Sequence, residues 1–66
     1  MKNKLKVQRA MHDLTQADLA EKIGVTRQSI NAIEKGKYVP STVLALKIAR
    51  LFKERVENIF TLEEND

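Results

Sequence analysis

The chain has 66 residues with two Gly, one Pro and no Cys, and its formal net charge is +3. A chain of this length folds as one domain whose core is too small for a large enclosed active site, because folding buries only about 60% of the unfolded surface. The lack of Cys excludes disulfides and thiolate metal ligands, and no apolar run could span a membrane or form a signal peptide, so we expect a cytoplasmic protein.

The N-terminal third of the chain predicts two short helices. A weakly amphipathic pattern indicates a first helix over Leu5–Met11. Thr15 is a typical N-cap residue, and Asp18 supplies the acid of a capping box three residues later. A second helix is therefore expected over Gln16–Ile23. Gly24 follows it and ends it, because glycine readily adopts the left-handed backbone conformation.

A third helix follows after a tight turn. Thr26 is placed to cap it, the helix is expected over about residues 27–35, and Gly36 ends it. Its apolar residues Ile30 and Ile33 share one face, while the opposite face carries Arg, Gln and Asn instead of the Lys and Glu usual on a solvated helix. That composition indicates a surface that donates and accepts hydrogen bonds.

The C-terminal half predicts one long helix and one short one. Ser41 is the expected N-cap of a helix over Thr42–Phe52, whose wide apolar face indicates that it is central and largely buried. A last short helix is expected around Val56–Ile59. The alternation from Phe60 to Leu62 favours a short strand that pairs with Lys2–Lys4.

Charge is unevenly distributed along the chain. Residues 1–50 hold ten Lys or Arg against four Asp or Glu, a balance of +6, while residues 51–66 have a balance of −3. A basic body indicates a polyanionic partner, although charge alone does not distinguish nucleic acid from an anionic membrane. The alternative is that these charges only keep the protein soluble.

The run LTQADLAEKIGVTRQSINAIEKGKYVPS resembles the helix-turn-helix family that includes phage repressor and Cro proteins and small bacterial and archaeal regulators. The resemblance implies an all-α, compact five-helix, lambda-repressor-like DNA-binding domain. This single domain would cover residues 1–66, with the helix-turn-helix at about 16–35 and an acidic tail at 61–66. The chain departs from the family pattern at Gln8, where an apolar residue is usual, and at Lys53, where a Gly often closes the fourth helix in a left-handed turn.

In such proteins the second helix of the motif enters the major groove of DNA, and residues of its first turn contact base edges. Gln28 is the strongest candidate, because its amide can pair with adenine N6 and N7. We expect base contacts from four residues: Arg27, Gln28, Asn31 and Ala32. The alternative for Asn31 and Ala32 is an ordinary role on a helix surface.

The resemblance also implies contacts to the DNA backbone, where positively charged groups and helix N-termini bind phosphate. The expected phosphate contacts are Gln16, Thr26, Ser29, Lys35, Lys37 and Tyr38. For Ser29 and Lys35 a structural role is an open alternative. Arg9 and Glu34 are expected to form a semi-buried ion pair that serves the architecture of the domain.

A homodimer is expected because one short recognition helix reads only a few base pairs, and two copies on a palindrome would double the contacts. The candidate interface is the C-terminal segment with Val56, Ile59, Phe60 and Leu62. The alternative is that these residues complete the core of one chain, and Phe60 and Leu62 are the better candidates for the interface.

The sequence thus predicts a sequence-specific regulator of transcription that binds double-stranded DNA, a repressor acting as a homodimer. One alternative is a protein-interaction module with the same fold, such as an antitoxin-like or coactivator-like adaptor. Another is nucleic-acid binding without sequence preference. No enzyme, cofactor, metal site or small-molecule ligand is expected, because His12 is the only histidine and no metal-ligand spacing or phosphate-binding loop is present.

Overall fold

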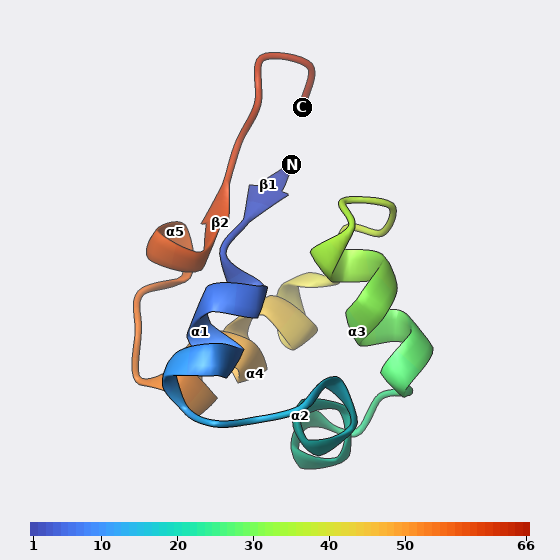
Figure 1. Cartoon of the computed structure of the whole chain (residues 1–66). Helices are drawn as coiled ribbons and strands as arrows, with labels where there is room; N and C mark the ends of the chain where they lie inside the picture. Colours follow the sequence, from blue (N-terminus) through green and yellow to red (C-terminus); the bar gives the residue numbers. More distant parts are fainter.

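The computed structural model describes all 66 residues as five helices around a small core, with the two ends of the chain joined in a two-stranded sheet (Figure 1). The elements follow the order β1 (Lys2–Asn3), α1 (Leu5–Met11), α2 (Gln16–Ile23), α3 (Arg27–Glu34), α4 (Thr42–Phe52), α5 (Val56–Ile59) and β2 (Phe60–Thr61). The expected five-helix fold is confirmed, and the expected pairing of the two chain ends is present as this small sheet instead of a hairpin. No helix is long and apolar enough to cross a membrane.

The predicted start and end of α2 are confirmed by its hydrogen bonds. The Asp18 backbone N–H donates to Thr15 Oγ1 and the Thr15 N–H donates to Asp18 Oδ2, both at 3.0 Å, which completes the capping box. At the other end, Gly24 has a φ of +76°, where a side chain would be strained. Sequence chemistry therefore fixes both ends of this helix.

The helix α3 ends one residue earlier than expected, at Glu34, and Lys35 is its C-cap. Thr26 Oγ1 accepts from the Ser29 N–H at 3.1 Å, as expected of an N-cap. Gly36, with a φ of +73°, turns the chain away from the helix. The two helices thus begin with capping hydroxyls and are separated by a tight turn.

Twelve apolar residues make the core, and five of the six fully buried side chains are Leu5, Leu19, Ile30, Ile33 and Ile48, from α1 to α4. Ile59 is the sixth, and Phe60 is only 8% exposed. Both side chains pack inside their own chain, which favours the alternative that they complete its core, and their dimer contacts stay a prediction. Val56 is partly buried against the same core, and of the four candidates only Leu62 is well exposed, at 77%.

The face of α1 that turns inward is not the one its apolar residues suggest. Gln8 is 9% exposed, while Val7 and Met11 are 55% and 68% exposed. The Gln8 side chain has no hydrogen-bond partner in the chain. Every buried side-chain nitrogen or oxygen in the chain does have a partner, so the polar atoms of Gln8 are not among the buried ones. Its amide therefore reaches solvent while its methylene groups pack, which is how a polar residue occupies a position that is usually apolar.

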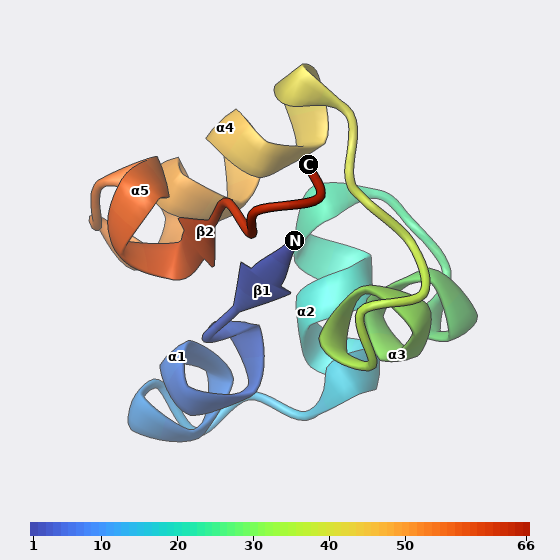
Figure 2. The ribbon, with the colours of Figure 1, turned by 90° about the horizontal axis from the view of Figure 1, so that it is seen from above.

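The terminal strands hold the end of α3 as well as each other. Lys2 pairs with Thr61 and Asn3 with Phe60 in antiparallel register. The Asn3 side-chain amide also donates to the carbonyl of Ile33 at 2.7 Å, which satisfies a carbonyl at the C-terminal end of α3. Seen from above, β1 and β2 lie between α1, α4 and α5 (Figure 2).

Lys53 closes α4 in the left-handed conformation, with a φ of +53°, as the departure from the family pattern predicts. The left-handed conformation destabilises a non-glycine residue by about 1 kcal/mol. A glycine would remove this strain, although its greater freedom in the unfolded chain offsets part of the gain. We expect Lys53→Gly to raise the thermal midpoint by a few degrees. Lys47→Gly is the matched control in the same helix and should lower it, since its backbone is helical. A lower midpoint for Lys53→Gly would contradict the strain.

Candidate nucleic-acid interface

The helix α3 has one face in the core and one in solvent. Ile30 and Ile33 are fully buried, whereas Arg27 and Gln28 are exposed and their side chains take part in no hydrogen bond or ion pair within the chain. α2 lies beside α3, and the turn between them is tight (Figure 2). The guanidinium of Arg27 and the amide of Gln28 are thus presented to solvent at the N-terminal turn of a helix whose other side is buried. The guanidinium only donates hydrogen bonds, and the amide can donate and accept them.

An ion pair joins α1 to the C-terminal end of α3. Arg9 Nε donates to Glu34 Oε2 at 2.7 Å and Arg9 Nη2 donates to Glu34 Oε1 at 3.1 Å, a bidentate arrangement. The two side chains are only 15% and 7% exposed. Arg9 Nη1 also donates to the carbonyl of Leu14 at 2.9 Å, in the loop before α2. One guanidinium therefore connects three segments of the chain.

The carboxyl of Glu34 stays ionised in this setting. Burial alone would raise its pKa, but hydrogen bonds from Arg9 and Gln16 outweigh that effect, and the pKa lies below its usual value. The pKa of Arg9 is raised, chiefly by its hydrogen bond to Glu34. Both partners are charged at neutral pH.

The side chain of Gln16 is hydrogen-bonded to both Glu34 and Asn31. Its Nε2 donates to Glu34 Oε1 at 3.1 Å and to Asn31 Oδ1 at 3.3 Å. An amide nitrogen carries two hydrogens, so both are used within the chain. The expected phosphate contact of Gln16 stays a prediction, although in this conformation both hydrogens of its amide are used within the chain and its Oε1 is the atom without a partner.

The remaining candidates for the DNA backbone lie at the two ends of α3. Thr26 Oγ1 and Ser29 Oγ are 3.0 Å apart at the N-terminal end, so Ser29 also takes part in capping. Lys35, Lys37 and Tyr38 are exposed just after the helix, and the two lysines form no ion pair with a carboxylate. Ala32 is partly exposed on α3. The structure thus brings these side chains around one helix.

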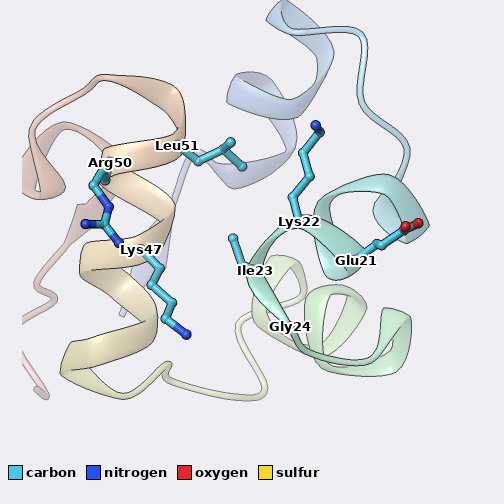
Figure 3. Close-up of a pocket in the computed structure, with 7 residues that line it drawn as sticks. All are labelled: Glu21, Lys22, Ile23, Gly24, Lys47, Arg50 and Leu51. Carbon is cyan, nitrogen blue, oxygen red and sulfur yellow. The ribbon is translucent and has the colours of Figure 1, made fainter.

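A hollow of about 450 Å³ lies between α2 and α4, away from these residues (Figure 3). It is lined by Glu21, Lys22, Ile23, Gly24, Lys47, Arg50 and Leu51. None of the expected base or phosphate contacts lines it. The candidate interface is therefore the exposed surface of α3, outside this hollow.

The chain has no group of His, Asp and Glu side chains arranged to hold a metal ion. His12, the sole histidine, lies against Phe52 with ring centroids 4.9 Å apart. This contact joins the end of α1 to the end of α4 and gives His12 a packing role.

The helix-turn-helix family model matches residues 5–59, from the start of α1 to the end of α5. The chain belongs to the helix-turn-helix family. Membership confirms the resemblance to phage repressor and Cro proteins, and this family contains regulators of transcription and not enzymes.

Several helix-turn-helix relatives are similar to the chain along its whole length. An uncharacterized HTH-type transcriptional regulator of Methanocaldococcus jannaschii is 61% identical over 66 residues, which is 100% of both chains. YgzD of Bacillus subtilis, with the same description, is 53% identical over 66 residues and again 100% of both chains. A third, from Archaeoglobus fulgidus, is 46% identical over 66 residues, covering 100% of this chain and 93% of the relative.

The stabilising effect of the Arg9–Glu34 pair should depend on pH. Because the pKa of Glu34 is lowered on folding, its contribution is present above the ordinary value of about 4.5 and is lost as the pH falls through the folded value. We expect Glu34→Gln to cost about 2–3 kcal/mol at pH 7, between an exposed and a fully buried pair. The difference in thermal midpoint from the unmodified chain should shrink below about pH 4.5.

Glu57→Gln is the control for this experiment, because Glu57 also pairs with an arginine but is 60% exposed. Its effect on the midpoint should be much smaller at every pH. If the midpoint of Glu34→Gln equalled that of the unmodified chain at pH 7, the structural role of the pair would be wrong.

Proposed function

We propose that this protein is a transcriptional regulator that binds double-stranded DNA in a sequence-specific manner through α3. The observation that carries the proposal is the free state of Arg27 and Gln28, exposed and without partners at the N-terminal turn of a helix whose other side is buried. Unpaired donors at this position match the geometry by which the second helix of such a motif reads the major groove. The relatives named above are described as transcriptional regulators, which supports the same function.

In this proposal Gln28 and Arg27 contact bases, and Ala32 lies close enough to the groove floor to meet a thymine methyl group. Thr26, Ser29, Lys35, Lys37 and Tyr38 would bind phosphates on both sides of α3. A balance of +6 over residues 1–50 supports attraction to DNA.

We further propose a two-fold homodimer that binds a palindromic operator. α3 has eight residues and is therefore about 12 Å long, enough to read only a few base pairs. Two copies related by a two-fold axis would place their recognition helices about 34 Å apart, one turn of DNA, on the two halves of a palindrome. Leu62 is the exposed apolar residue that the C-terminal segment offers to such an interface.

Repression is the regulatory outcome that needs nothing beyond this binding. A domain seated on promoter DNA excludes polymerase from the same surface by steric overlap. The alternatives are an adaptor that binds a protein and a domain that binds any nucleic acid, and both differ from the proposal in how binding depends on salt and on sequence.

Affinity for duplex DNA should fall by roughly 10³-fold between about 50 and 200 mM salt if about six phosphates are neutralised. Lys37→Ala should reduce the slope of log affinity against log salt by about one, since a phosphate contact is lost. Gln28→Ala is the contrasting variant: it should leave the slope unchanged and relax the preference at one base pair, at a cost of about 1–3 kcal/mol. A flat salt dependence, or equal affinity for unrelated duplexes, would contradict the proposal.

The dimer is tested by sedimentation at micromolar concentration, with and without the selected operator. We expect the mass of two chains per duplex, and Leu62→Asp should reduce it towards one chain. Val43→Asp is the matched control, because Val43 is also a well-exposed apolar residue, at 65%, on α4. A monomer mass that persists on operator DNA would refute the dimer.

A further inference from the structure

Four side chains form a continuous line of hydrogen bonds from α1 to the exposed side of α3. Arg9 donates to Glu34, Glu34 accepts from Gln16, and Gln16 donates to Asn31. The hydrogen-bonded pairs are far apart in the sequence: 15 positions for Gln16 and Asn31, 18 for Gln16 and Glu34, and 25 for Arg9 and Glu34. The line exists only because the fold brings three helices together.

The chemistry of each member fixes the orientation of the next. A guanidinium only donates and an ionised carboxylate only accepts, so the group of Gln16 that faces Glu34 must be its NH₂. The same NH₂ meets Asn31, and the atom of Asn31 that faces it must therefore be Oδ1, as found at 3.3 Å. The Asn31 amide is thereby held in one of its two orientations.

The other end of that amide is free and open to solvent. Asn31 Nδ2 takes part in no hydrogen bond, and no buried side-chain nitrogen or oxygen in the chain lacks a partner, so Nδ2 must be accessible. Asn31 lies one helical turn after Arg27 and three residues after Gln28, on the same side of α3. The surface that meets DNA in the proposed function thus carries two further hydrogens to donate.

We propose that Gln16 is a positioning residue that presents Asn31 to DNA as a donor, and that Asn31 thereby selects guanine over adenine. This inference rests on the proposed function. Guanine offers two adjacent acceptors, N7 and O6, in the major groove, which match the two hydrogens of one NH₂ group. Adenine would instead need Asn31 Oδ1 to turn toward its N6, and the hydrogen bond from Gln16 holds Oδ1 toward α2.

The inference changes the role of two residues expected from the sequence. Gln16 acts on base preference without touching DNA through its amide hydrogens, and Asn31 does not form the bidentate pair with adenine that an unconstrained Asn or Gln forms. The Gln28 side chain has no partner in the chain, so both the carbonyl oxygen and the NH₂ group of its amide are available for adenine. Two amides on one helix would therefore read opposite patterns.

The test is selection from a random duplex pool, followed by measured affinities for operators that differ at one base pair. Asn31→Ala identifies the base pair that Asn31 reads, as the one where preference is lost. There we expect the unmodified chain to favour guanine over adenine by at least roughly fivefold. Gln16→Met, which keeps the length of the side chain without its hydrogen bonds, should bring that ratio close to one. Preferences at the other base pairs should not change.

Gln28→Met is the matched control, since it removes an amide from the same helix face and should change a different base pair. A merely structural role for Gln16 would lower affinity for all sequences alike.

NMR of the unmodified chain gives a measurement that requires no variant to fold. The side-chain NH₂ hydrogens of Gln16 should exchange with water more slowly than those of Asn31. If Asn31 is protected instead, or if the chain selects adenine at its base pair, or if Gln16→Met leaves the ratio unchanged, the inference is overturned while sequence-specific binding stands. If the unmodified chain selects no sequence, the proposed function itself fails.

Discussion

The bidentate pair of Arg9 and Glu34 is the interaction on which the exposed face of α3 depends. α3 contributes only two fully buried side chains, Ile30 and Ile33, and an eight-residue helix in isolation is unstable in water. Glu34 fixes the last turn of that helix to α1, and Asn3 binds the carbonyl of the residue before it. The apolar contacts and these polar ties together hold a short helix without using its outer face.

The role of this pair is to orient other groups more than to add net stability. Replacing such a pair by apolar residues is often neutral, because the attraction between the charges is offset by their loss of hydration. An apolar pair could not, however, orient an amide. Glu34 offers Oε1 to both Arg9 and Gln16, so the same carboxylate that joins the helices also determines which end of Gln16 faces α3.

The sequence predicted the helices well because their ends depend on local chemistry. The hydroxyls of Thr15, Thr26 and Ser41 bind backbone N–H groups three residues later, and Gly24 and Gly36 adopt positive φ, so each boundary follows from residues near it. The buried side of α1 was harder to predict, since Gln8 turns inward and Val7 outward. Nothing in a seven-residue pattern shows that the amide of Gln8 can reach solvent while its stem packs.

The site was predictable residue by residue but not as a set of orientations. Arg27 and Gln28 could be recognised because they depart from the usual composition of a solvated helix. The state of Gln16 and Asn31 could not, because it arises from a carboxylate 18 residues away from Gln16. An amide carries a donor and an acceptor on one carbon, and the sequence alone leaves both directions open. In a helix this short, the direction of one amide is a large part of the pattern that DNA would meet, so the polar contacts behind the helix belong to the recognition surface as much as the residues on it.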